Sequence, residues 1–168
     1  MLNFFKKKVA GAAFVHHLVP APKTIVLASG FENTRTIRVF PKGWDDNSAR
    51  LGSCSVAAAI EDLLWLAENG VRLQHAAIVL TRGPHSRLSE RDRDRLWEAF
   101  GVPVFEQCLG VDNELLAMEC EAHDGLHIMG TASRAGAEKS VCGCGSSVPR
   151  RMPKLQRAEE FEPALMTA

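Results

Sequence analysis

The stretch "HAAIVLTRGPHSRLSERDRDRLWEAFGVPVFEQ" (residues 75–107) decides the fold class of this chain. Residues 75–81 form a short, continuous apolar run, which is typical of a buried strand. Ser89 begins a variant capping box and predicts the start of a helix, which ends at Gly101. Residues 102–107 predict a second strand. A strand, a helix and a strand in succession indicate parallel strands in an α/β layer.

The preceding residues extend this alternation. Residues 24–40 contain two β-branched runs, which predict a pair of strands joined by a turn, and residues 41–50 predict a loop. A helix is expected next, capped by Ser53 or Ser55 and stopped by Gly70. Its apolar positions at helical spacing are Val56, Ile60, Leu63, Leu64 and Ala67.

The length of 168 residues fits one compact domain. We expect a single α/β domain over residues 1–148, with a mostly parallel sheet flanked by helices and a C-terminal zinc-bound loop and hairpin over residues 117–146. The tail, residues 149–168, shows little core-forming pattern and is expected to be peripheral or disordered.

Charge and cysteine content limit the partners and the compartment. Lys+Arg and Asp+Glu are balanced at 20 each, so no overall field attracts nucleic acid or an anionic membrane. The expected partner is therefore a small molecule or a protein, and a homo-oligomer is possible. Five cysteines without a disulfide pattern favour a reducing compartment. His16 and His17 interrupt the apolar run that follows three lysines, so we expect a cytoplasmic protein without a secretory signal.

Two short stretches of the C-terminal part gather metal-binding residue types, namely "MECEAHDGLHIMG" (118–130) and "VCGCG" (141–145). A hairpin that turns at Asp124 and Gly125 presents one cysteine and one histidine on the same side. Glycines beside the last two cysteines leave backbone N–H groups free to bond thiolates. Three thiolates and one imidazole fill the tetrahedral coordination sphere of Zn²⁺, which predicts a structural zinc site. The predicted ligands are Cys120, His127, Cys142 and Cys144.

Other interpretations of these residues stay open. His123 competes with His127 for the fourth position, although an exposed histidine is ordinary in the turn where His123 lies. The thiols could also be small buried hydrophobes that bind no metal. A redox pair of Cys142 and Cys144 is a third interpretation, but a one-residue spacer strains a disulfide ring.

The order of several short motifs resembles one enzyme family. "TRGPHSRLSERDRDRLWEAFGVPVFEQ", then "ECEAHDGLHI", then "CGCGSSVPR" are similar to the middle of phenylacetate-CoA ligase-like adenylate-forming enzymes, over roughly residues 76–151. Some members of that family bind zinc with the matching cysteines and histidine. The resemblance therefore implies the same four zinc ligands in this chain.

The chain departs from the family where ATP chemistry takes place. The family wraps ATP phosphates in a Ser/Thr/Gly-rich loop, which this sequence lacks. Its aromatic-Gly-x-Thr-Glu stretch falls on residues 108–112, where Asp112 alone keeps the acid. We therefore expect a zinc-binding, non-catalytic module that binds a ligand or a partner. The alternative is an acyl- or aryl-CoA ligase component completed by another chain.

Two further sets of residues could carry chemistry. Arg82 and His85 lie at a strand end, where open α/β sheets usually bind ligands, and together with Asp112 they are the predicted pocket residues. Cys54 and Cys108 are candidate thiol nucleophiles. Cys54 lies near the start of the expected helix, a position that would lower the pKa of its thiol.

Overall fold

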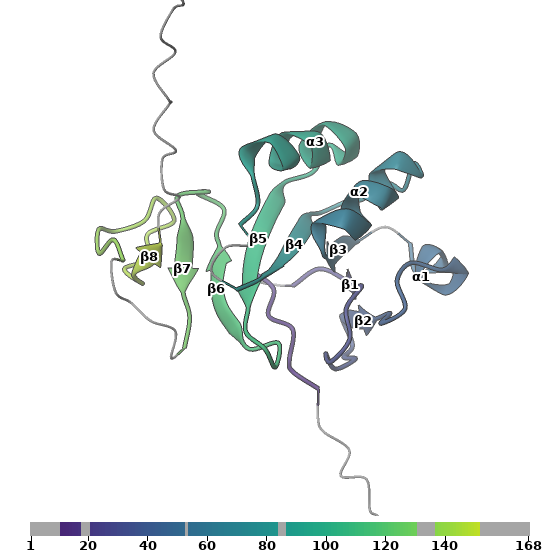
Figure 1. Cartoon of the computed structure of the whole chain (residues 1–168), viewed down its shortest axis with the longest axis horizontal. Coiled ribbons are helices and arrows are strands. Elements are labelled where there is room, and N and C mark those ends of the chain that lie inside the picture. Colours follow the sequence, from purple (N-terminus) through teal and green to yellow (C-terminus); the bar gives the residue numbers. More distant parts are fainter. Residues whose placement is uncertain (1–10, 18–20, 53, 84–86, 131–136, 152–168) are drawn as a thin grey trace, which may run out of the picture.

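The structure is a computed structural model that describes residues 11–17, 21–52, 54–83, 87–130 and 137–151. Its strands are β1 (Thr24–Val26), β2 (Ile37–Val39), β3 (Ser55–Ala58), β4 (Ala77–Arg82), β5 (Val104–Leu109), β6 (Leu115–Glu119), β7 (Leu126–Ile128) and β8 (Arg150–Arg151). Its helices are α1 (Asp46–Arg50), α2 (Ile60–Glu68) and α3 (Glu90–Phe100). The eight strands form one mixed sheet in the order β2-β1-β3-β4-β5-β6-β7-β8 (Figure 1).

The sheet changes character at β5. Strands β2, β1, β3, β4 and β5 pair in parallel, whereas β6, β7 and β8 follow in antiparallel order. Only residues 110–114 connect β5 to β6, which is too short for a crossover to a parallel strand. The predicted mostly parallel sheet is therefore correct for its first five strands, here called the parallel part. Strands β6–β8, with the loop between β7 and β8, are the antiparallel part.

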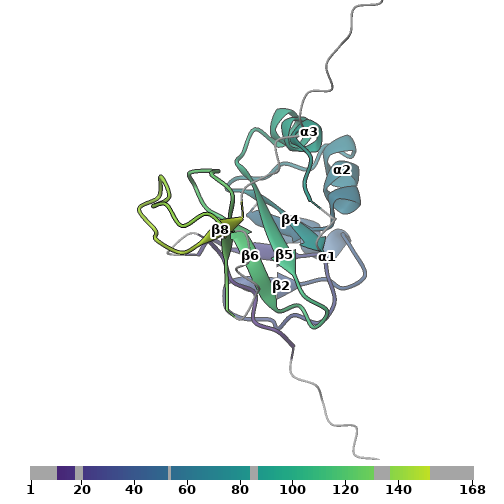
Figure 2. The same ribbon diagram turned by 60° about the vertical axis from the view of Figure 1, so that its left-hand side comes forward.

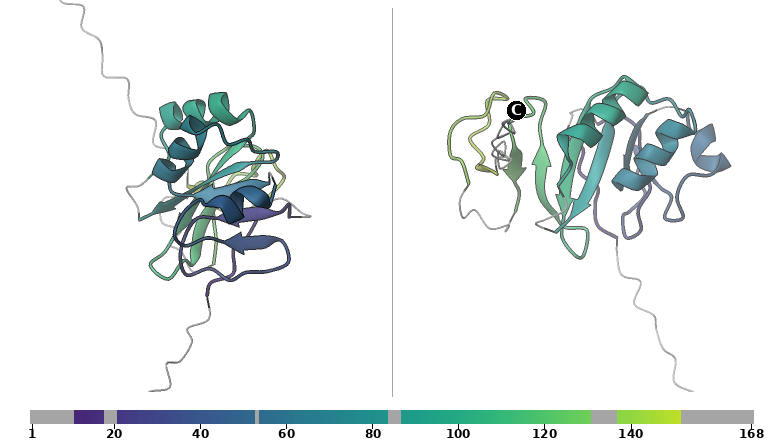
Figure 3. Two further views of the ribbon diagram at one scale, coloured as in Figure 1. Left: turned by 90° about the vertical axis from the view of Figure 1, so that its right-hand side faces the viewer. Right: turned by 45° about the horizontal axis from the view of Figure 1, so that its top comes forward.

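The parallel part is covered by helices on one face. α2 and α3 lie side by side on that face, and α1 lies at the end of the sheet farthest from β8 (Figure 1, Figure 3). Below them lies an apolar core that includes Val56, Leu66 and Leu96, all fully buried. The opposite face has its own cluster, in which Phe14 packs edge-on against Phe31 at a centroid distance of 5.7 Å.

The predictions for residues 75–107 are confirmed. The Ser89 side chain accepts a hydrogen bond from the Asp92 N–H at 3.1 Å and caps α3. Gly101 ends that helix with φ of 64°, a left-handed conformation in which a side chain would be strained. β4 and β5 then pair in parallel from Ala77 to Arg82.

Three expectations upstream are wrong. β1 and β2 pair in parallel, so residues 27–36 carry the chain back across the sheet and do not form a hairpin turn. Val56 belongs to buried strand β3 instead of a helix, because the site between β1 and β4 buries all four residues of that strand. The predicted loop at 41–50 contains α1, whose cap is the Asp45 side chain.

The tail begins later than expected. β8 pairs Arg150 with His127, and Arg150 is 2% exposed. The predicted end of the domain at residue 148 is therefore too early, because Arg150 and Arg151 form the last strand of the sheet. Residues 152–168, the rest of the predicted tail, lie outside the described residues. None of the helices found in the described part of the chain has the length and apolarity needed to cross a lipid bilayer.

Candidate metal centre

The β6–β7 hairpin positions the first cysteine and the histidine. Cys120 directly follows β6, and His127 lies in β7 opposite Met118. The chain reverses between them, where the His123 N–H donates to the Cys120 carbonyl at 3.0 Å. His123 and Gly125 take positive φ values of 50° and 82° in this turn. The predicted hairpin is confirmed, and its turn extends from Cys120 to Gly125.

A second loop positions the other two cysteines. Its base is closed by two backbone hydrogen bonds between Glu138 and Arg150, at 2.8 and 2.9 Å. At its tip the Cys142 N–H donates to the Ser146 carbonyl at 2.9 Å, and the Gly145 N–H donates to the Cys142 carbonyl at 2.8 Å. This tight turn places Cys142 and Cys144 beside the hairpin.

The four predicted ligands meet at one place, here called the Cys/His cluster. Its members are Cys120, His127, Cys142 and Cys144, whose potential ligand atoms all lie within 4.8 Å of one another. Sγ of Cys120 lies 3.6 Å from Sγ of Cys142, and Sγ of Cys144 lies 3.6 Å from Nε2 of His127.

These spacings fit a metal ion. A disulfide would bring two sulfurs to about 2.05 Å, much closer than the 3.6 Å between the sulfurs of Cys120 and Cys142, and all three cysteines of the cluster are free. Zinc bonds of about 2.3 Å to sulfur and about 2.0 Å to nitrogen place the ligand atoms of a tetrahedron roughly 3.5–3.8 Å apart. Two of the six pairs of ligand atoms, at 3.6 Å, agree with that arrangement, and all six pairs lie within 4.8 Å. The Cys/His cluster can therefore hold a metal ion.

Backbone N–H groups point at two of the sulfurs. The N–H of Cys144 bonds the sulfur of Cys142 and lowers the pKa of the Cys142 thiol. The N–H of Ala122 bonds the sulfur of Cys120 in the same i, i+2 relation, but burial dominates and raises the pKa of the Cys120 thiol to about 11. A metal ion must displace that proton, so binding is coupled to proton release.

Arg150 is a neighbour of the cluster that the sequence analysis missed. Its guanidinium forms an ion pair with the Asp124 carboxylate and donates to the Asp124 carbonyl at 2.6 Å. It also donates to Ser140 Oγ at 2.9 Å, so it links the hairpin turn to the cysteine loop. Hydrogen bonds to the Cys142 sulfur are the larger cause of the lowered pKa of this thiol, and the positive charge of Arg150 lowers that pKa further. Three thiolates on a divalent ion leave a net charge of about −1, which this buried cation offsets.

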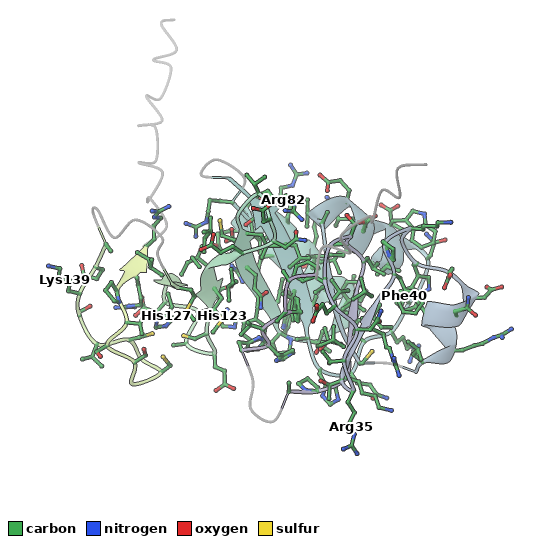
Figure 4. All side chains as sticks on the ribbon, turned by 90° about the horizontal axis from the view of Figure 1, so that it is seen from below. Arg35, Phe40, Arg82, His123, His127 and Lys139 are labelled. Carbon is green, nitrogen blue, oxygen red and sulfur yellow. The ribbon has the colours of Figure 1, made fainter. Side chains whose placement is uncertain are left out.

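His123 is directed away from the cluster. Its Nδ1 lies 3.3 Å from Oε1 of Glu119, and its ring stacks on Phe105 at 4.9 Å between centroids. His127 is thus the histidine beside the sulfurs, and Figure 4 labels both histidines on the side of the molecule that carries the antiparallel part.

Glu119 joins the hairpin to the parallel part. Its Oε2 accepts hydrogen bonds from Arg93 on α3 and from the Glu106 N–H on β5, both at 3.0 Å. The carboxylate is 6% exposed, so these contacts replace most of its hydration. Sequence alone gave no signal for this residue beyond its position before Cys120.

The predicted pocket residues lie at the other edge of the sheet. Arg82 ends β4 and donates to the Gly110 carbonyl at 3.1 Å and to Oδ1 of Asn113 at 2.5 Å. Asp112 is exposed in the same turn. Both Arg82 and Asp112 belong to the described residues, and no ion pair joins them. His85 lies outside the described residues. Arg82 thus fastens the β5–β6 turn, and Figure 4 shows it far from His127.

The candidate nucleophiles are not activated. Cys54 precedes strand β3, so the helix start expected beside it is absent from this part of the described chain. Burial raises the pKa of both the Cys54 and the Cys108 thiols. A raised pKa reduces the thiolate fraction on which nucleophilic catalysis depends.

The antiparallel part, which carries the cluster, projects beyond the helices at one end of the sheet (Figure 2). Neither the known family models nor the curated proteins contain a match to this chain. The resemblance to phenylacetate-CoA ligase-like enzymes therefore stays an interpretation of motif order.

Proposed function

We propose that this protein is a zinc-binding, non-catalytic α/β module that binds a small ligand or a partner protein. The observation that carries the zinc assignment is the meeting of three sulfurs and one imidazole nitrogen within 4.8 Å, contributed by two separate segments. Soft thiolate ligands with imidazole in a tetrahedral set favour zinc over magnesium or calcium, which prefer oxygen.

A structural role follows from the ligand count. Four protein ligands leave no open position for water, whereas catalytic zinc keeps one. The loop and hairpin joined by the ion contribute only a few buried apolar residues, so a cross-link there replaces a hydrophobic core.

The state of the candidate chemical groups supports a binding role. Among the described residues, the thiols outside the cluster have raised pKa values, and Arg82 is engaged by the neighbouring turn. A binding protein needs neither a nucleophile nor a general base.

Metal content tests the proposal. We expect about one zinc per chain in protein purified from medium without added metal, measured by mass spectrometry of the elements. Cys142→Ser and Cys144→Ser should each lose most of the zinc and lower the melting temperature. Cys54→Ser is the matched control, since Cys54 lies outside the cluster, and it should keep its zinc. Zinc-free native protein, or full zinc content in both cluster variants, would overturn the assignment.

A second candidate is a ligase component completed by another chain. It is favoured by one observation: the "EC", "GLH", "CGCG" and Pro-Arg motifs of the resemblance include Cys120, His127, Cys142 and Arg150, which are neighbours here. ATP-dependent release of pyrophosphate with a panel of aryl and acyl acids tests this candidate. Turnover that disappears in Asp112→Ala would replace the binding-module proposal with this one.

A further inference from the structure

Two cavities lie at the edge of the sheet where the parallel strands begin. One has a volume of about 300 Å³ and the other about 180 Å³. Cys54, directly before β3, lines both of them, so the two spaces meet at this residue. This edge is opposite to the one that carries Arg82, where β4 ends.

The smaller cavity has a cationic wall. Lys23, Arg35 and Arg38 line it, and none of these three forms an ion pair with another residue of the described segments. Figure 4 shows Arg35 extending outward from the body of the protein, where a solute can reach its guanidinium. Three unneutralised cations around one small space attract a multiply charged oxyanion, and guanidinium groups match phosphate in a bidentate geometry.

The larger cavity has an apolar wall. Trp44, Val56 and Val71 line it, and the Trp44 indole is half-buried against the core below the helices. A half-exposed indole beside aliphatic side chains provides a flat surface on which an apolar or aromatic group can pack.

The thiol between the cavities is compatible with an anion. Burial raises the pKa of Cys54, and its Sγ lies 3.4 Å from the Gly52 carbonyl. The thiol therefore remains neutral and does not repel a negative ligand. The Lys23 ammonium is close enough to act electrostatically on this thiol, which places a positive charge near the junction.

We propose that the two cavities form one binding site for a phosphate monoester of an apolar group, with the phosphate among Lys23, Arg35 and Arg38 and the apolar group against Trp44. This inference rests on the proposed binding function and names the class of its ligand. It does not require the metal, because the site lies wholly in the parallel part and its flanking helix α1.

The probe is phenyl phosphate, with inorganic phosphate and phenol as its two halves. We expect phenyl phosphate to bind the zinc-loaded full chain and to shift backbone amide resonances of β1, β2 and the segment after α2. Each half alone should bind at least tenfold more weakly. No resonance shift at saturating probe, or shifts confined to the Arg82 edge, would overturn the proposal.

Variants assign the two halves of the site. Replacing both Arg35 and Arg38 with Gln should weaken the binding of phenyl phosphate at least tenfold, because two charge-assisted contacts to the phosphate are lost. Trp44→Leu should weaken phenyl phosphate but leave inorganic phosphate unchanged. Arg91→Gln, an exposed cation on α3, is the matched control and should bind like the native chain. Equal affinity in the double variant and the control would contradict the assignment.

The zinc proposal and the phosphate-ester proposal can be tested independently of each other. Cys142→Ser that keeps its circular dichroism spectrum should still bind phenyl phosphate although it lacks zinc. Native protein that contains zinc but ignores the probe would refute only the anion site.

Discussion

The two parts of the sheet are held together by different kinds of interaction. The parallel part encloses two clusters of buried apolar side chains, and neither cluster extends past Leu115. In the antiparallel part the buried residues include Glu119, His127 and Arg150, with few apolar neighbours. Apolar burial is non-directional and tolerates exchange, whereas buried polar groups need every partner in place. The antiparallel part should therefore depend on its cross-links far more than on its core.

Removing the metal should produce the largest difference between the two parts. A structural zinc contributes about 10–16 kcal/mol of apparent binding free energy at neutral pH. After chelation, the amides of β7, β8 and the cysteine loop should exchange with deuterium rapidly, while those of β3 and β4 keep their protection. Hydrogen exchange followed by mass spectrometry measures this. A uniform rise across the whole sheet would mean that the two parts unfold as one unit.

A substitution that leaves a cavity in the core of the parallel part should destabilise that part and leave the metal site unchanged. Leu66 lies on α2 and is fully buried, so Leu66→Ala should lower the free energy of unfolding by about 2–5 kcal/mol. The zinc content should not change. Leu64→Ala, on the same helix but only partly buried, is the control and should cost less. Urea denaturation gives both values, and zinc loss in Leu66→Ala would show that the parts are coupled.

Replacing the buried arginine should affect only the antiparallel part. Arg150→Gln removes the ion pair with Asp124 and the bond to Ser140, at a cost of about 1–3 kcal/mol. It also removes the positive charge beside the Cys/His cluster, so on the zinc proposal competition with a chromogenic chelator should reveal weaker zinc binding. Arg91→Gln, an exposed cation on α3, is the control and should change neither quantity appreciably.

The smallest expected effect is pH dependence at the seam between the parts. The Phe105 ring lies between His123 and His17, and His17 in turn stacks on His16. Both ring nitrogens of His17 are buried, and neither has a hydrogen-bond partner within the described part of the chain. Burial, together with the charges of His16 and His123, lowers the pKa of His17 to about 4.

This lowered pKa determines the sign. Between about pH 6.5 and the folded pKa of about 4, the unfolded imidazole binds a proton that the folded one excludes. The free energy of unfolding should therefore fall as the pH falls, by about 1 kcal/mol because the ring is only partly buried. Urea denaturation at pH 7 and at pH 5 gives the free energy of unfolding at each pH. This free energy should fall less between the two pH values in His17→Phe than in the native chain. The variant controls for proton-driven zinc loss, since both proteins carry the same cluster.

Local patterns predicted the parts of the fold that local interactions determine. Residues 75–107 carried a cap, a stop glycine and two apolar runs, and all four appear in the structure. The four cluster residues were also recognisable, because cysteines beside glycines in a polar loop are poor core residues. The prediction that Val56 lies in a helix is wrong. Its spacing from the next apolar residues suits a helix, but burial between two neighbouring strands determines its extended conformation.

The missed residues are those whose roles depend on distant partners. Arg150 lies in a stretch whose composition is that of a basic tail. Only the pairing of β8 with β7 reveals that its side chain is buried. Glu119 similarly depends on Arg93, which lies 26 positions earlier in the chain. The parallel pairing of β1 and β2 was missed because a turn signal between two strands does not specify their relative direction.

The exposure of Cys144 sets how a bound ion leaves. Three members of the Cys/His cluster are buried or half-buried, whereas Cys144 faces solvent. An incoming chelator can replace this sulfur first and strip the ion one bond at a time. The release rate should then rise with chelator concentration, instead of saturating at the rate of global unfolding. Release would then begin at Cys144, before the β6–β7 hairpin and the cysteine loop separate.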